Sequence, residues 1–299
     1  MATPAEQLAY AQGVIQPGQV AEAITQGELA AVLQNAANDA AKLVEANLAK
    51  GGIGAATRAR QLQAASDGLG SLSSSMWGKI GALTRSGVYH ASELAVNQQI
   101  DREYLMGMPF NAIRQYEGPM FFSAYQSAED IISRRTNGFS LAERIYRNGQ
   151  ATVIQVGKIV DTGLATQQSA MEIAKQVRGH FDPNVPGGTS YAANRLARTE
   201  INNAHHDTTI RTTEQQPWVL GYKWNLSSSH PKPDVCNEYA DDDHVGLGSG
   251  VYKKGGVPSK PHPHCFCYLS IFQDDREQFL KKLTNGQYDN RLRDLGVRC

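Results

Sequence analysis

The residues best suited to chemistry lie near the C-terminal end, between His230 and Cys267. Cys236 stands near one end of this segment, and His262, Cys265 and Cys267 stand at the other. Thiolate and imidazole are ligands that zinc prefers, and a structural zinc ion takes four of them in a tetrahedron. The sequence therefore predicts a metal site formed by these three cysteines and His262, with structural zinc as the candidate cofactor.

The same cysteines allow two other interpretations. They could be small buried apolar side chains on an interior strand. In oxidising surroundings, Cys236 could instead form a disulfide with Cys265 or Cys267. The Cys-x-Cys spacing is also less common in zinc sites than paired Cys-x-x-Cys motifs. His262 lies beside proline in a loop, where histidine is often exposed to solvent. Zinc, a disulfide and free thiols therefore all stay open.

No motif predicts catalytic residues. The acidic run Asp241–Asp243 with His244 has the composition of a hard-metal site, but such runs in glycine-rich loops are usually solvated. A zinc deaminase needs His-x-Glu and Pro-Cys-x-x-Cys, and a serine hydrolase of the nucleophile-elbow type needs Gly-x-Ser-x-Gly. The chain contains none of these patterns. We therefore expect a structural protein rather than an enzyme.

Composition narrows the function classes further. The chain has 299 residues, with 29 basic and 29 acidic side chains, so its formal net charge is zero. A protein that wraps DNA normally carries a clustered positive excess, which this chain lacks overall. No apolar run approaches membrane-spanning length, and the N-terminus lacks the basic and apolar regions of a signal peptide. We expect synthesis in the cytoplasm and no membrane partner.

The N-terminal elements follow from hydrophobic periodicity. Residues 4–115 have helical composition, and apolar residues recur at steps of three and four within Ala21–Lys50. The Gly/Ser-rich stretch 67–75 predicts a loop, and Glu117–Pro119 predicts a break. Because the apolar residues here are mainly alanine, which buries little area, this part should depend on helix packing or on a partner surface.

The C-terminal elements must position the cysteines. Ser140 and Glu143 form a capping-box pattern at the start of a helix. Large side chains alternate over 218–226, which predicts a strand, and 265–272 predicts a second one. The loop between these strands, about 35 residues long, is too long for a compact domain unless something staples it.

These patterns predict an α+β fold that is mainly helical. A helical arm would precede a domain of helices and a small antiparallel sheet, in which the Cys/His segment staples the long loop. The predicted parts are an alanine-rich assembly arm, a central domain and a C-terminal helix with a tail, over residues 1–115, 116–272 and 273–299.

Residues from about 120 to 272 resemble the phage head morphogenesis domain of the Mu F-like minor head proteins. Five short motifs in order carry the resemblance: Arg198-Thr199-Glu200, the strand around Trp224, His230–Cys236, Gly246–Gly248 and His262–Cys267. Their order and spacing are more specific than any one motif. The chain departs from many relatives in having Phe266 where they have arginine, and no second cysteine soon after Cys236.

The resemblance implies a low-copy minor capsid protein of a tailed phage. Such a protein would be made in the host cytoplasm and built into the head interior near the portal, where it aids head morphogenesis and DNA packaging or ejection. Its partners would be the portal protein or the major capsid protein, with contact to packaged DNA. The motifs imply structural roles for four residues: Arg198, Glu200, Trp224 and Asp234.

Two alternative functions stay open. The domain is sometimes fused to toxins, so the chain could be a zinc-stapled nuclease or an ADP-ribosyltransferase-like effector. A transferase of that kind would need a late Glu-x-Glu pair, which is missing. The chain could also be a head decoration protein or a head–tail adaptor, which would differ from a minor capsid protein in location and copy number.

Overall fold

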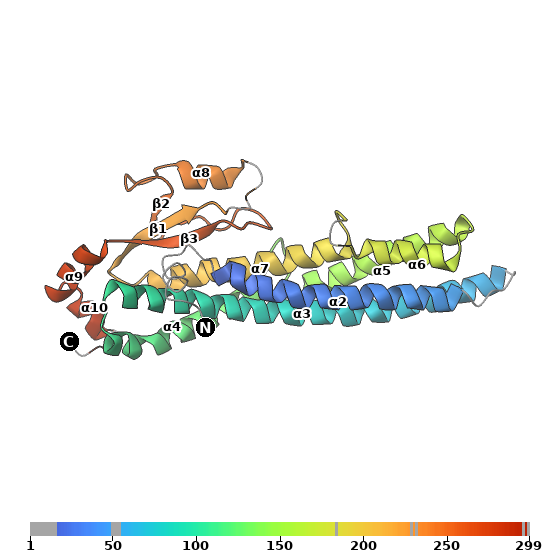
Figure 1. The fold of residues 1–299 in the computed structure, drawn as a ribbon, viewed down its shortest axis with the longest axis horizontal. Helices are drawn as coiled ribbons and strands as arrows, with labels where there is room; N and C mark the ends of the chain where they lie inside the picture. The colour runs from blue at the N-terminus through green and yellow to red at the C-terminus, as the bar shows by residue number, and fades with distance from the viewer. Residues whose placement is uncertain are drawn as a thin grey trace. The chain divides into compact units, whose positions relative to one another are not determined.

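The fold is α+β and mainly helical, with a small antiparallel sheet in the C-terminal region, as predicted. It is seen in a computed structural model, which describes residues 17–48, 55–182, 185–227, 230, 233–294 and 297 (Figure 1). Residues 1–16, at the start of the predicted arm, lie outside the described residues.

Contacts between Cα atoms divide the chain into two units. Unit 1 comprises the described residues of Met1–Ala23, Gly87–Ile132 and Arg198–Cys299, and unit 2 those of Ile24–Ser86 and Ser133–Ala197. The boundary predicted near residue 115 falls inside unit 1 and does not coincide with this division. Long helices contribute residues to both units, so neither unit is one continuous stretch of the chain.

Unit 2 is built from helices. Most of its described residues come from five helices: α2 (Pro17–Leu48), α3 (Ala55–Met106), α5 (Leu141–Ala165), α6 (Ala170–His180) and α7 (Thr189–Thr213). The capping box of Ser140 and Glu143 at the start of α5 is confirmed. The loop predicted at 67–75 is wrong, because α3 continues through it. A Cβ on Gly68 would lie 2.5 Å from the Leu43 side chain, so this glycine permits close helix packing.

The helical part of unit 1 contains a second correction. A turn at Gly107, with φ of 98°, separates α3 from α4 (Phe110–Ser133). The break predicted at Glu117–Pro119 is wrong, since α4 passes through Pro119. Pro119 is exposed, so water can bond the carbonyl oxygen that the missing proline N–H leaves free. The proline therefore does not end the helix.

The sheet of unit 1 has the strand order β2-β1-β3, and both pairings are antiparallel. The central strand β1 (Val219–Asn225) lies within the predicted 218–226. The edge strand β3 (Tyr268–Gln273) starts three residues later than predicted. The sequence analysis did not predict β2 (Val251–Lys253) or α8 (Val235–Asp241), which occupy the long loop. Two short helices end the fold: α9 (Arg276–Thr284) and α10 (Asp289–Asp294).

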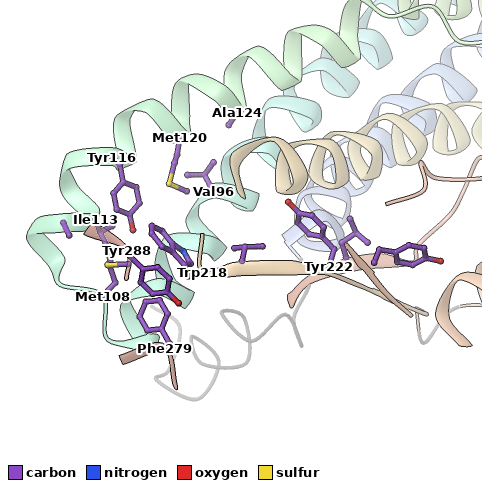
Figure 2. Close-up of a cluster of buried hydrophobic side chains, with 14 of the residues drawn as sticks. Val96, Met108, Ile113, Tyr116, Met120, Ala124, Trp218, Tyr222, Phe279 and Tyr288 are labelled. Atoms are coloured by element: carbon purple, nitrogen blue, oxygen red, sulfur yellow. The ribbon is translucent and has the colours of Figure 1, made fainter. Parts of the chain in front are cut away.

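The hydrophobic core of unit 1 gathers large aromatic rings between α4, β1 and the C-terminal helices. Figure 2 shows Trp218 beside Tyr116 and Tyr288, with Phe279 next to Tyr288, and the Trp218 ring centroid lies 5.7 Å from that of Tyr288. The Trp218 indole also donates a 3.0 Å hydrogen bond to Glu103, which is buried. The three cysteines belong to this same core.

Among the described residues, no helix combines the length and the apolar character needed to cross a membrane.

Candidate metal centre

Three cysteine sulfur atoms meet in the core of unit 1. Cys236 is in the first turn of α8, while Cys265 and Cys267 directly precede β3. All three thiols are buried and free, and their sulfur atoms lie within 4.8 Å of one another. The Cys236 and Cys265 sulfur atoms are 3.6 Å apart. The cluster could hold a metal ion.

Local capping explains how Cys236 is positioned. Asp234 is the N-cap of α8, and its carboxylate accepts a 2.7 Å hydrogen bond from the Cys236 amide. In return, the Asn237 side-chain oxygen accepts a 3.0 Å hydrogen bond from the Asp234 backbone amide. This pair of bonds fixes the first turn of a helix that is only seven residues long. The Cys236 side chain therefore projects from a defined backbone.

Two histidines flank the thiols. His262 Nε2 lies 3.5 Å from Cys236 Sγ and 3.1 Å from a carboxylate oxygen of Asp234. His230 Nδ1 lies 3.8 Å from Cys267 Sγ. The three predicted cysteines thus lie together, and His262 lies beside one of them, Cys236, in a second group with Asp234. His230, which the sequence analysis did not select as a ligand, lies beside Cys267.

Helix α7 holds the turn between His262 and Cys267. Arg198 contacts His264 at 3.0 Å between Nη1 and Nδ1, and its guanidinium lies 4.1 Å from the centre of the Phe266 ring. The hydroxyl of Thr199 accepts a 3.3 Å hydrogen bond from the His264 backbone amide. Arg198 therefore links the helix to the loop, and Phe266 forms part of that link.

The other two residues predicted to be structural are also buried in unit 1. Glu200 on α7 is fully buried. Trp224 on β1 packs edge-on against His206 of α7 at 5.7 Å and against Tyr239 of α8 at 5.2 Å, between ring centroids. Trp224 therefore connects the sheet to the helix that carries Cys236.

The electrostatic environment of the thiols is uneven. Burial, with Cys267 nearby, raises the pKa of Cys236 to about 12. A hydrogen bond from Cys267, together with the Lys260 ammonium, lowers the pKa of Cys265. That same bond, with burial, raises the pKa of Cys267. Lys260 donates to the Cys267 carbonyl oxygen. Without an ion, the cluster favours protonated thiols, with Cys265 the first to ionise.

The acidic run forms a turn away from these ligands. The Asp243 carboxylate accepts hydrogen bonds from the backbone amides of three following residues, including that of Gly246 at 2.7 Å. His244 stacks on Tyr252 and contacts its hydroxyl at 2.8 Å. Two groups of three ligand-type side chains are found in the described part of the chain, Cys236–Cys265–Cys267 and Asp234–Cys236–His262, and neither includes this run.

Sequence reasoning missed Asn237, Lys260 and His230 as parts of the site. The Asp234-x-x-Asn237 spacing is a weak capping signal that could have indicated Asn237. Nothing in the sequence indicates that Lys260 folds back onto Cys267. No family model matches this chain, and neither does any curated protein or solved structure. What the site does is therefore inferred from its own geometry and from the sequence motifs.

Proposed function

We propose that this chain is a minor structural protein of a tailed-phage head, and that one zinc ion staples its unit 1. The main support is that motifs far apart in the sequence meet at one site. Residues of three motifs that carry the Mu F-like resemblance, Arg198-Thr199, His230–Cys236 and His262–Cys267, meet at one buried site, although Arg198 and His264 are 66 positions apart. Motifs that share one site are expected where they jointly maintain a fold.

The donor set suits zinc. With Zn–S bonds of about 2.3 Å, a tetrahedral ion separates two sulfur ligands by about 3.8 Å, and a sulfur and a nitrogen ligand by about 3.6 Å. The Cys236–Cys265 distance of 3.6 Å and the Cys236–His262 distance of 3.5 Å are close to these values. Three thiolates and an imidazole would fill all four positions, and a filled site is structural rather than catalytic.

A staple would stabilise the segment between β1 and β3. Within its described residues, this segment contains a seven-residue helix and a three-residue strand, too little regular structure to order it alone. Structural zinc contributes about 10–16 kcal/mol of binding free energy in small zinc-finger peptides. The ion would tie α8 to the residues before β3, giving a rigid building block for contact with the portal or the major capsid protein.

Elemental analysis and thiol counting on the purified full chain test the staple. We expect about one zinc per chain and three thiols that react only after chelation. A Cys265→Ser variant should lose the zinc. Reactive thiols without zinc in the wild type, or a loss of thiols through disulfide formation, would contradict the staple.

Particles made from a genome that encodes this chain test the assembly role. Quantitative mass spectrometry of purified heads should find a few copies per particle, and the Cys265→Ser variant should be depleted. A stoichiometry equal to that of the major capsid protein would favour a decoration protein, and recovery with tails would favour an adaptor. Metal-dependent DNA cleavage or ADP-ribosyl transfer by the purified chain would replace the structural proposal with an enzymatic one.

A further inference from the structure

We infer that Asn137 is a site of spontaneous deamidation, and that the fold selects it over the two other Asn-Gly pairs of the chain. The three pairs are Asn137-Gly138, Asn148-Gly149 and Asn285-Gly286. The only reagent is water, and the reaction requires neither an enzyme nor a cofactor. The inference depends neither on the metal ion nor on the proposed role in a phage head.

An Asn-Gly pair is reactive because glycine has no Cβ to hinder an attack by its backbone nitrogen. That nitrogen forms a bond to Cγ of the asparagine, and its proton leaves with the side-chain nitrogen as ammonia. Water then opens the resulting succinimide ring at one of its two carbonyl carbons. One opening gives aspartate, and the other gives isoaspartate, in which the main chain runs through the side-chain methylene. The glycine nitrogen must therefore be free to approach Cγ.

The turn at Asn137 leaves this nitrogen free. Thr136 and Phe139 exchange two backbone hydrogen bonds, of 2.9 and 3.1 Å, which close a two-residue turn. Both residues of the turn are exposed, and both have positive φ, 51° for Asn137 and 82° for Gly138. Within the described part of the chain, the Gly138 nitrogen makes no hydrogen bond, while its carbonyl oxygen accepts one from Arg135 at 2.9 Å.

Opening of this turn is a small local event. Asparagine tolerates positive φ better than most residues do, but it does not prefer it. An opening lets Asn137 leave that conformation and breaks only the two hydrogen bonds between Thr136 and Phe139, at the surface. Local openings of this size need far less free energy than global unfolding. The Gly138 nitrogen can therefore reach Cγ of Asn137 while the rest of the chain stays folded.

The pair Asn148-Gly149 is protected by helix packing. Both residues lie within α5, where backbone nitrogens take part in helix hydrogen bonds. Gly149 is buried, and its carbonyl oxygen accepts the Ser73 hydroxyl at 2.9 Å. A Cβ on Gly149 would lie 3.4 Å from the Trp77 ring. Attack on Asn148 would require α5 to unwind and to leave this contact.

The pair Asn285-Gly286 is held by a helix end. Asn285 is exposed, as Asn137 is. The Gly286 nitrogen, however, donates a 3.1 Å hydrogen bond to the Leu283 carbonyl oxygen, and the Asn285 nitrogen donates one of 3.1 Å to that of Lys281. Exposure alone therefore does not distinguish the pairs, whereas the hydrogen bonding of the glycine nitrogen does.

The two products should differ in their effect on α5. Isoaspartate at position 137 lengthens the main chain of the turn by one atom, so Thr136 and Phe139 cannot keep both of their bonds. Phe139 directly precedes Ser140, the N-cap of α5, and its ring lies 4.0 Å from the Arg147 guanidinium. Isoaspartate should therefore loosen the first turn of α5, whereas aspartate keeps the length of the main chain.

Timed incubation of the full-length chain tests the assignment. Peptide mapping by mass spectrometry would follow the conversion of amide to acid at the three pairs, in native buffer and in urea. In native buffer, we expect Asn137 to convert at least about tenfold faster than Asn148, since opening a helix breaks more hydrogen bonds than opening this turn. Asn137 should also convert faster than Asn285. In urea the three rates should converge, because each asparagine precedes a glycine. Faster conversion at either other asparagine in native buffer, or the same rate ratios in native buffer as in urea, would overturn the inference.

Asn137→Gly is the matched control, because glycine adopts positive φ and has no side-chain amide. It should abolish most of the ammonia release that the folded wild type shows, and an unchanged release would refute the assignment to Asn137. Methylation by an isoaspartyl methyltransferase would identify the isoaspartate product. Hydrogen exchange at the start of α5 should be faster in wild type enriched in isoaspartate and unchanged in Asn137→Asp. Equal exchange in all three proteins would contradict the expected effect on the turn.

Discussion

At the scale of single residues, the charge of Lys260 should affect metal binding. Its ammonium donates to the Cys267 carbonyl oxygen beside the three thiols, and burial lowers its pKa. A buried cation is unfavourable unless negative charge lies nearby. Thiolates on a metal ion would supply that charge, so the lysine and the metal should stabilise each other.

Lys260→Met tests this coupling, because it keeps the length of the side chain and removes the charge. We expect zinc affinity to fall by about tenfold, a loss of about 1.4 kcal/mol, while the metal-free protein is no less stable. Lys253→Met, at an exposed lysine of β2, is the matched control and should change neither quantity. Competition titration measures the affinity, and an unchanged value for Lys260→Met would show that the charge is not coupled to the metal.

His205 on α7 should make stability depend on pH. Burial, with the Lys260 charge nearby, lowers the pKa of His205 to about 3, so it is neutral in the folded chain. The unfolded chain takes up the proton near pH 6.5. The stability that His205 contributes is therefore complete above pH 6.5 and declines as the pH falls toward 3.

The expected loss from His205 is about 2 kcal/mol between pH 7 and pH 5. Urea unfolding of the wild type and of His205→Gln at both pH values measures it. The difference between the two proteins isolates this residue, because acid-driven metal release affects both. Parallel pH dependences in the two proteins would mean that His205 is protonated in the folded chain.

At the scale of elements, the β1–β2 pairing depends on a glycine. A Cβ on Gly221 would lie 2.2 Å from the Tyr252 carbonyl oxygen, which is backbone and cannot turn aside. Gly221→Ala should therefore push the two strands apart and destabilise the chain by about 1–3 kcal/mol. Gly78 on α3 is the matched control, since it is exposed and a Cβ there meets nothing within 4 Å. Gly78→Ala should stabilise by about 0.5–1 kcal/mol in the same urea unfolding assay.

Local signals predicted the elements that local interactions form. The alternation around Trp224 predicts β1, and Ser140 with Glu143 predicts the start of α5, because each is a property of neighbouring residues. The same reasoning failed at Gly68 and Pro119, where packing and solvent exposure keep a helix intact despite a residue that disfavours it. Strand β2 has three residues and exists through its pairing with β1, which no local pattern encodes.

The metal centre, too, was predicted from the sequence only in part. The residue types and the Cys-x-Cys spacing predicted that Cys236 meets Cys265 and Cys267, and the sulfur atoms do lie together. His262, which the spacing indicated, lies beside Cys236. No local pattern indicates that His230 lies beside Cys267.

At the scale of the whole molecule, the candidate ligands are confined to one unit. Cys236, Cys265, Cys267 and both flanking histidines belong to unit 1, and the helices α5 and α6 belong to unit 2. Unit 2 has its own buried contacts, among them a 3.0 Å hydrogen bond between the side chains of Trp77 and Thr152. Local stability can differ between parts of one chain.

Metal removal should therefore act on one unit. Hydrogen exchange of the zinc-loaded full chain, followed by mass spectrometry with and without chelator, should show lost protection in α8, β2 and the residues before β3. Peptides from α5 and α6 should exchange unchanged, because no ligand lies in them. Cys236→Ser should reproduce the pattern without chelator, since it removes a ligand at the first turn of α8. Equal loss in both units would mean that the chain unfolds as one cooperative whole, and no change would mean that the ion does not hold the loop.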